Sequence, residues 1–246
     1  MRIVAWNIRA GGGRRSDGIT AQLVRWRADV AVLSEFRATE PSLCIAASLA
    51  ARGLSFQRTT SDPRNHARNA LLVASRWPLR RLPLAHAPHM GHRWLAVNVA
   101  APHRFAVLAL HVPNRSSGHK DAFLDSVTRI VSRWRGASGL LIGDTNSGRI
   151  RLDEESSAFD RLEDGWMQGL AALGWQDAFR VLHGERREFT WYSPNGNNGF
   201  RLDQGFLHPR LVPGLRGASH HWGGHAGNRR DTLSDHAALV LDLDLH

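Results

Sequence analysis

Residues 140–146 limit the possible folds of this chain more than any other stretch. The sequence Leu-Leu-Ile-Gly-Asp-Thr-Asn opens with apolar residues typical of a short buried strand and closes on polar residues that include Asp144 and Asn146. Gly143 leaves room for a backbone or a ligand to come close. Asp and Asn also favour turns, so this stretch alone supports a functional site and an ordinary turn equally.

The same pattern recurs along the chain. Four predicted apolar strands end on a side chain that can bind a metal or transfer a proton, and two more begin on one. The first four side chains are Asn7, Glu35, His111 and Asp144, and the other two are Asp203 and His236. If the last two strands run antiparallel to the first four, all six side chains meet at one rim of the fold. Six such coincidences are hard to attribute to turns.

The remaining elements follow from hydrophobic periodicity. Helices are expected at residues 19–28, 43–51, 122–134 and 160–173. Strands are expected at residues 2–6, 30–33, 70–75, 94–99, 105–110, 140–143, 189–192, 201–207 and 237–243. Two groups of histidines fall in predicted loops, where we expect them to face solvent rather than a metal: His86, His89 and His92, and His220, His221 and His225.

The length and composition predict one domain. A chain of 246 residues that is 42% hydrophobic can bury one large core, so we expect a single, monomeric domain over residues 1–246. The single cysteine, Cys44, excludes an internal disulfide and fits a reducing compartment. The first strand begins at Arg2, which leaves no room for a signal peptide. No apolar run approaches the roughly 20 residues that cross a bilayer, and we expect a cytoplasmic protein without a membrane span.

The net charge of +10 favours a polyanionic partner such as DNA. A second explanation fits the charge as well. Lys120 is the only lysine among 32 basic residues, and such a bias towards arginine can come from genome composition. The arginines are also spread along the chain without a run of five or six.

The polar residues at the strand ends predict metal-assisted chemistry on a phosphate ester. Asn, Glu and Asp offer oxygen ligands and there is no cluster of cysteines, so the metal should be hard, Mg²⁺ or Mn²⁺. Two histidines and further carboxylates can transfer protons. A hard metal beside paired His and Asp suits the cleavage of a phosphate ester, where negative charge builds on the phosphoryl oxygens.

At these positions the sequence resembles the endonuclease/exonuclease/phosphatase superfamily, which includes exonuclease III, abasic-site endonucleases, pancreatic deoxyribonuclease, sphingomyelinases and inositol-polyphosphate phosphatases. The matching pieces are Trp6-Asn7-Ile8, Ser34-Glu35-Phe36-Arg37, His111-Val112-Pro113-Asn114, Gly143-Asp144-Thr145-Asn146, Arg201-Leu202-Asp203 and Ser234-Asp235-His236. Each is short, but their order and spacing together are specific. The resemblance implies an α/β (α+β) fold, a four-layer sandwich with two mixed sheets face to face and helices outside.

The resemblance also implies a role for each residue. Asn7, Glu35 and Asp235 would lie at the metal, with Glu35 as its main ligand. Asp144 would position or deprotonate the attacking water, and Asn146 would orient the water and the phosphate. His236, oriented by Asp203, would contact the phosphate or take the proton. The residues expected to bind substrate are Asn114, Arg37, Asn69 and Arg201.

Two departures from the abasic-site branch bear on the substrate. That branch has tyrosine where this chain has His111, whereas the deoxyribonuclease and sphingomyelinase branches have histidine, a candidate general acid. The abasic-site branch also has an acidic residue where this chain has Arg9. Phe200 stands where abasic-site enzymes keep an aromatic wall, and a hydrophobic plug explains it equally well.

Three functions remain open. We expect a metal-dependent nuclease that cleaves DNA with little sequence preference. The alternatives are a phosphoesterase acting on a phospholipid head group or a phosphorylated small molecule, and a binding module without activity.

Overall fold

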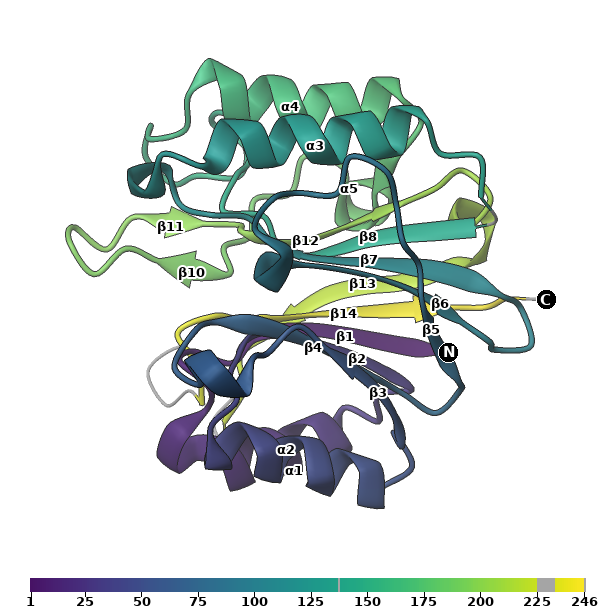
Figure 1. Ribbon diagram of the computed structural model, residues 1–246. Helices are drawn as coiled ribbons and strands as arrows, with labels where there is room; N and C mark the ends of the chain where they lie inside the picture. Colours follow the sequence, from purple (N-terminus) through teal and green to yellow (C-terminus); the bar gives the residue numbers. More distant parts are fainter. Residues whose placement is uncertain (137, 225–232, 246) are drawn as a thin grey trace.

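Two mixed β-sheets face each other at the centre of the molecule, and helices cover the outer face of each (Figure 1). The computed structural model describes residues 1–136, 138–224 and 233–245. Within these residues each large sheet has six strands, and a separate two-stranded ribbon projects from one end. The order of layers, helices–sheet–sheet–helices, confirms the predicted four-layer sandwich.

The first sheet has the strand order β13-β14-β1-β2-β4-β3. Its strands are β1 (Arg2–Asn7), β2 (Val30–Phe36), β3 (Phe56–Thr59), β4 (Ala70–Ser75), β13 (Leu215–His221) and β14 (Ala238–Leu243). β1 and β2 are parallel, so both end at the same edge of the sheet. β14 runs antiparallel to β1 and therefore begins at that edge.

The second sheet has the order β5-β6-β7-β8-β12-β9. Its strands are β5 (Leu79–Arg81), β6 (Trp94–Val99), β7 (Phe105–His111), β8 (Ser138–Asp144), β9 (Gln176–Asp177) and β12 (Asp203–Leu207). β7 and β8 are parallel, and β12 runs antiparallel to β8, with Asp203 opposite Asp144. The two-stranded ribbon consists of β10 (Trp191–Tyr192) and β11 (Gly199–Phe200).

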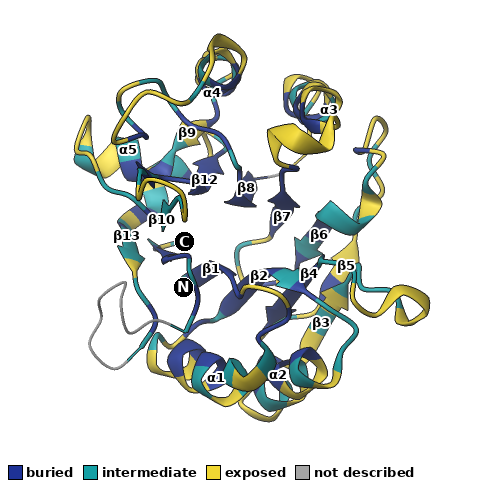
Figure 2. Cartoon of the chain, turned by 90° about the vertical axis from the view of Figure 1, so that its left-hand side faces the viewer, coloured by how far each residue is buried: buried dark blue, intermediate teal, exposed yellow. Residues whose placement is uncertain are grey.

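The helices pack on the outside because each has one apolar stripe. They are α1 (Ser16–Arg25), α2 (Glu40–Ala51), α3 (Lys120–Ser132), α4 (Arg161–Ala172) and the short α5 (Ala178–His183). α1 and α2 lie on the first sheet, and α3 and α4 on the second (Figure 1). Their outer faces are exposed while the central strands between them are buried (Figure 2).

One core fills the space between the two sheets. Val32 of the first sheet and Val107 and Ile142 of the second belong to it, and each is at most 1% exposed. Separate apolar clusters seal each sheet to its own helices. Since side chains on alternate faces of the central strands enter different clusters, both faces of these strands are buried. This explains why they read as continuous apolar runs rather than alternating ones.

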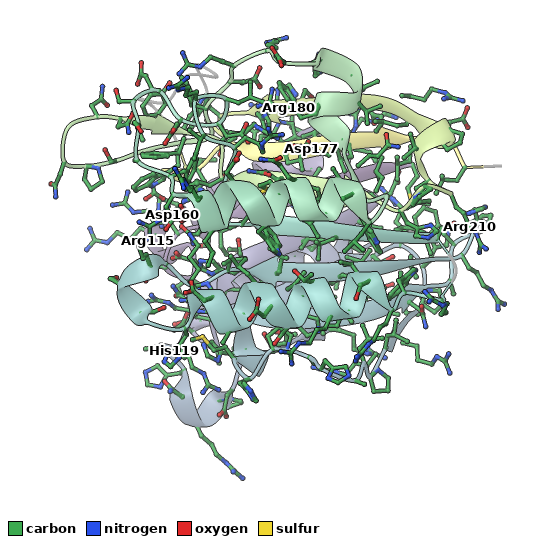
Figure 3. The ribbon with its side chains drawn as sticks, turned by 90° about the horizontal axis from the view of Figure 1, so that it is seen from above. Arg115, His119, Asp160, Asp177, Arg180 and Arg210 are labelled. Carbon is green, nitrogen blue, oxygen red and sulfur yellow. The ribbon has the colours of Figure 1, made fainter. Side chains whose placement is uncertain are left out.

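Arg115 and Asp160 form an ion pair of 2.8 Å where the chain enters α3 and α4 (Figure 3). A capping box at the start of α4 joins Asp160 and Glu163. Glu163 is buried and also pairs with Arg115 and with Lys120. These contacts fix the ends of both helices beside the rim at which β7 and β8 end.

The main predicted helices and strands form, with ends that differ by a few residues. Periodicity missed β3, β5, β9, α5, β11 and β13, which are short or lie at sheet edges. The second histidine group was placed wrongly in a loop. His220 and His221 belong to β13, and the His220 side chain is only 2% exposed. His225 lies outside the described residues. None of the helices in the described part is long and apolar enough to cross a membrane.

Candidate active site

The six side chains predicted at strand ends meet at one rim of the two sheets. Asn7 and Glu35 come from the first sheet, and His111 and Asp144 end neighbouring parallel strands of the second. A cavity of about 300 Å³ opens between them. Its lining residues are Asn7, Glu35, Asn69, Arg93, His111, Asn114, Asp144, Asn146, Trp191, Leu202, Asp235 and His236. The predicted convergence of the strand ends is therefore confirmed, whereas the role of each residue stays a prediction.

Asn7 links the two carboxylates at the floor of this cavity. Its Nδ2 donates to Asp144 Oδ2 at 3.0 Å and lies 3.4 Å from Glu35 Oε1. Its Oδ1 accepts the backbone N–H of Arg9 at 3.0 Å. A carbonyl oxygen has two lone pairs, so Oδ1 can accept a further partner. The amide thus holds the carboxylates of both sheets at a fixed separation.

Glu35 adopts a backbone conformation that is rare for a residue with a side chain. Its φ is +58°, at a bulge between Ser34 and Phe36 where β2 shifts register against β4. The Gly-rich loop after β1 stabilises this bulge. Ala10 N–H donates to Glu35 Oε2 at 2.7 Å, and Gly11 N–H donates to its carbonyl at 2.8 Å. The bulge turns the carboxylate into the cavity, and strained residues of this kind cluster at functional sites.

Gly143 allows β7 and β8 to approach just before Asp144. Its φ is +142°, and a Cβ at this position would lie 2.0 Å from the Leu110 carbonyl oxygen. The close approach predicted from the glycine is therefore a contact between backbones. Asp144 itself is 2% exposed, and its Oδ1 accepts the Asn146 N–H at 3.0 Å. Its Oδ2 faces both histidines of the site.

His236 and Asp203 form a buried pair. His236 Nδ1 lies 2.9 Å from Asp203 Oδ2, and its Nε2 lies 4.0 Å from Asp144 Oδ2. Burial alone would lower the pKa of His236, but the charge and hydrogen bond of Asp203, with Asp144 and Asp235, outweigh it and raise the pKa to about 9. The Nδ1 contact fixes the ring so that Nε2 faces the cavity.

His111 lies on the other side of Asp144, with 3.6 Å between Nε2 and Asp144 Oδ2. Burial lowers its pKa to about 4, only partly offset by the charge of Asp144. A neutral imidazole at pH 7 follows from this value. The two histidines that flank Asp144 thus differ in charge, which is how a site can separate acid from base.

Asn146 has a φ of +42°, and its Nδ2 donates to the Val112 carbonyl at 2.8 Å. The buried Lys120 ammonium donates to the Asn146 carbonyl. Lys120 therefore connects α3 to the loop that carries Asn146. Asn114 is exposed and lines the cavity at its outer edge.

The remaining predicted residues lie around this centre. Asn69 and Asp235 line the cavity. Arg37 does not line it, and instead its Nε donates to Asn69 Oδ1 at 2.7 Å, so it orients Asn69. Asp235 lies 3.8 Å from Arg9 Nε.

Sequence reasoning missed Arg93 and Trp191, which also line the cavity. Arg93 Nη1 donates to the His111 carbonyl at 3.4 Å, and its buried Nε has no hydrogen-bond partner among the described residues. The Trp191 ring lies 6.1 Å from the His236 ring. Neither belongs to a motif, and the only signal for either was its place beside a strand end.

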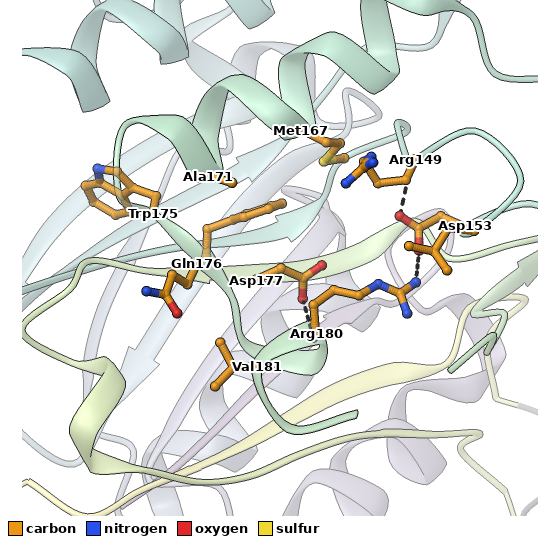
Figure 4. A pocket seen from close by; sticks show the side chains of 11 residues that line it. Arg149, Asp153, Met167, Ala171, Trp175, Gln176, Asp177, Arg180 and Val181 are labelled. Atoms are coloured by element: carbon orange, nitrogen blue, oxygen red, sulfur yellow. Dashed lines mark hydrogen bonds and ion pairs between the residues drawn. The ribbon is translucent and has the colours of Figure 1, made fainter. Parts of the chain in front are cut away.

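Arg201 was wrongly expected to bind substrate. Its side chain is fully buried, with Nε 2.8 Å from Asp153 Oδ1 and Nη2 2.5 Å from Asp177 Oδ2. Arg180 joins the same network through Asp153. Asp153, Asp177 and Arg180 line a second cavity of about 300 Å³ between α4 and α5 (Figure 4). Arg201 therefore stabilises the fold and contacts no substrate in the first cavity.

The donor set fits a hard divalent cation that keeps water ligands. In the described ranges, no three His, Cys, Asp or Glu side chains are grouped closely enough to hold a metal by themselves. Glu35 and the free lone pair of Asn7 Oδ1 offer oxygen donors at the cavity floor. Mg²⁺ is commonly bound through one or two carboxylates with several waters, so a sparse set of oxygen donors suits it better than Zn²⁺.

Comparisons with known proteins agree with this fold. The family model described as Endonuclease/Exonuclease/phosphatase family matches residues 4–236. No curated protein matches the chain in sequence. Among solved structures, the 3'-5' exonuclease NExo from Neisseria meningitidis is 22% identical with a TM-score of 0.78, and an AP endonuclease from Archaeoglobus fulgidus is 18% identical with a TM-score of 0.79. A structure of the 3' phosphatase NExo from Neisseria bound to a product DNA hairpin has 21% identity and a TM-score of 0.78. Each of the three alignments covers 100% of both chains.

Proposed function

Because the chain belongs to the endonuclease/exonuclease/phosphatase family, we propose that it is a divalent-metal-dependent phosphodiesterase that cleaves DNA with little sequence preference. The observation that carries the proposal is the convergence of Glu35, Asp144 and the His236–Asp203 pair on one polar cavity. A cavity lined by carboxylates, amides and histidines provides what the hydrolysis of a phosphate ester needs: a base, hydrogen-bond donors and oxygen ligands.

Asp144 is the residue that prepares the attacking water. Its Oδ2 faces the cavity within 4.0 Å of both histidine rings, so it can accept a proton from a water placed between them. The Asn146 N–H and the Asn7 amide hold the two carboxylate oxygens in place. A base whose orientation is fixed in advance contributes by geometry as well as by basicity.

His236 donates a hydrogen bond from Nε2 to a non-bridging oxygen of the phosphate. Asp203 accepts from Nδ1, which holds the ring and stabilises its positive charge. Arg93 supplies a second cation at the cavity wall, and its Nε is a buried donor in need of an acceptor. His111, neutral at pH 7, lies 3.6 Å from Asp144 Oδ2 and places an uncharged ring beside the carboxylate.

Glu35, Asn7 and Asp235 are the residues that would hold the metal. When bound, Mg²⁺ or Mn²⁺ neutralises negative charge on the phosphoryl oxygens. The Glu35 carboxylate is held by Ala10 N–H through one oxygen, which leaves the other oriented towards the cavity.

Two observations support DNA as the substrate. A net charge of +10 increases affinity for a phosphate backbone by counterion release, and this contribution carries no base information. Two of the similar structures are of NExo, which is described as a 3'-5' exonuclease in one and as a 3' phosphatase bound to a product DNA hairpin in the other. Histidine at position 111 in place of tyrosine is shared by the deoxyribonuclease and sphingomyelinase branches, so it also fits the alternative, a phosphoesterase with a small or lipid phosphoester substrate.

A salt titration separates the two. The Glu35→Gln variant is mixed with a fluorescent 20-mer duplex in Mg²⁺, so that binding is measured without cleavage. We expect affinity to fall at least about tenfold between 50 and 200 mM salt, as for several phosphate contacts. Cleavage by the wild type is followed in parallel on plasmid DNA, sphingomyelin and inositol phosphates. Weak binding that barely changes with salt, together with turnover of a small substrate, would contradict the nuclease proposal.

A further inference from the structure

Among the described residues, no strand pairs with Asp203 on the side of β12 that faces away from β8. In the described chain, β9 pairs with Phe206 and Leu207, at the far end of β12. The backbone N–H and C=O of Asp203 that point to this side therefore need other partners, because buried backbone groups without hydrogen bonds are costly. Two side chains provide them.

Thr190 binds the backbone N–H of Asp203. Its Oγ1 accepts the Leu202 N–H at 2.9 Å and the Asp203 N–H at 3.2 Å. Its backbone carbonyl accepts the Ala237 N–H at 2.8 Å, next to His236. Thr190 is fully buried and so connects the segments that carry both members of the Asp203–His236 pair.

His220 binds the backbone carbonyl of Asp203. Its Nε2 lies 3.1 Å from the Asp203 carbonyl oxygen, and its Nδ1 lies 2.9 Å from Glu188 Oε1. Both partners are acceptors, so each contact uses an N–H of the ring, and His220 joins the Asp203 carbonyl to the Glu188 carboxylate. The side chain is 2% exposed and stacks on Phe179, with 4.9 Å between ring centroids. The Glu188 carboxylate therefore holds the ring in the orientation that places Nε2 at the Asp203 carbonyl.

Glu188 is suited to that task. Burial would raise its pKa, but the hydrogen bond and charge of His220, with Arg186, outweigh burial and lower it. Arg186 Nη2 lies 2.7 Å from the other carboxylate oxygen, Oε2. Glu188 therefore stays ionised at neutral pH, with Oε1 at His220 and Oε2 at Arg186.

From these contacts we propose that His220, held by Glu188, is a positioning residue that fixes the Asp203 backbone and so orients the Asp203–His236 pair. The proposal rests on the proposed function only for its kinetic consequence. His220 touches neither the first cavity nor the reacting groups, and it acts through Asp203. Loss of its hydrogen bond should loosen Asp203 and lower turnover more than substrate affinity.

The kinetic test uses the full-length chain with Mg²⁺ and bis(4-nitrophenyl) phosphate as the probe. We expect His220→Leu to lower kcat about tenfold with KM within about twofold, in line with other residues that orient a functional group indirectly. Glu188→Gln should have a similar effect, because an amide oxygen holds the ring by a weaker hydrogen bond than a carboxylate does. His220→Gln keeps one donor for the Asp203 carbonyl and should recover at least about threefold over His220→Leu.

His183→Leu is the matched control. His183 also lies on the Phe179 ring and contacts a backbone oxygen, that of Ala218, at 2.7 Å, but it does not touch Asp203. We expect its kcat to stay within about twofold of wild type. A His183→Leu loss as large as that of His220→Leu would show a general packing effect and overturn the proposal.

A double-mutant cycle tests the route through Asp203. In an Asp203→Asn background, His220→Leu should lower kcat by less than about twofold further, since the residue it acts through is already impaired. A full tenfold further loss would mean that His220 acts elsewhere, and the proposal would fail.

A spectroscopic readout does not depend on activity. With ¹⁵N-labelled histidine, the hydrogen-bonded Nδ1–H of His236 is assigned by its disappearance in His236→Gln. We expect this signal to shift or broaden in His220→Leu and to stay unchanged in His183→Leu. An unchanged signal in His220→Leu would overturn the positioning role even in a chain that cleaves phosphoesters. A shifted signal in a chain that cleaves none would keep the positioning role and contradict the proposed function.

Discussion

Replacing Arg201 with methionine should destabilise the fold without removing a substrate contact. Arg201 is fully buried and bridges Asp153 and Asp177. Removing one partner of a buried ion pair leaves an uncompensated charge and commonly costs about 3–5 kcal/mol. Asp153 keeps Arg180, and Asp177 keeps the backbone N–H groups of Phe179 and Arg180, so we expect the lower end, about 3 kcal/mol.

This loss of stability corresponds to a decrease in the melting temperature. Unfolding entropy of roughly 2.1 cal/mol/K per residue gives about 0.5 kcal/mol/K for 246 residues, and 3 kcal/mol therefore corresponds to about 6 °C. Calorimetry at pH 7 measures this directly. Arg149→Met is the control, because Arg149 is 42% exposed where it pairs with Asp164 and such surface pairs contribute at most about 1 kcal/mol. A loss below about 2 °C in Arg201→Met would refute the reasoning.

Acid titration provides an independent check of the same network. Burial would raise the pKa of Asp153, but the charges of Arg201 and Arg180 outweigh burial and lower it. A carboxyl group with a lowered folded pKa contributes stability that is complete above its unfolded pKa, about 3.9, and is lost as pH falls towards the folded value. Wild-type stability should therefore fall below about pH 4, and in Arg201→Met the fall over this range should be shallower. Equal slopes for both proteins would exclude Arg201 as the cause.

Three further predictions concern the candidate active site. Glu35→Gln should lower turnover in Mg²⁺ at least about a hundredfold with little change in melting temperature, and near wild-type turnover would show that the metal assignment is wrong. Asp144→Asn and His236→Ala should each lower kcat at least about a hundredfold. Because both residues serve one step, the double variant should lose much less than the product of the two single losses. Multiplicative losses would place the two residues in separate steps. Gly143→Ala should lower the melting temperature by several degrees, because its Cβ would lie 2.0 Å from the Leu110 carbonyl oxygen; an unchanged value in calorimetry would contradict the strand contact.

The composition of the site was predictable because its information is local. Each of Asn7, His111 and Asp144 follows an apolar run directly, and the end of such a run is visible in sequence. Their meeting required one assumption, that β12 and β14 run antiparallel to β8 and β1, and the register confirms it. The positive φ of Glu35 was not predictable, because the bulge depends on pairing with β4.

Other features depend on partners far apart in the chain. β13 was missed because its sequence, LRGASHH, has little apolar alternation and pairs with β14 along a single edge. His220 was therefore assigned to solvent, whereas Glu188, 32 residues away, accounts for its burial. Periodicity reports the face on which a side chain lies, but it cannot identify an ion-pair partner from another element.

The Arg201-Leu202-Asp203 motif shows how one short pattern can combine separate tasks. Asp203 orients His236, while Arg201 is buried by Asp153 and Asp177, which lie 48 and 24 residues away. Between them, the Leu202 carbonyl accepts both the backbone N–H and the hydroxyl of Thr145 at 2.8 Å. Since Thr145 follows Asp144 directly, this contact sets Asp203 opposite Asp144. Arg201 thus acts on the site through the backbone that joins it to Asp203, and we expect its substitution to disturb the position of Asp203 rather than a contact with substrate.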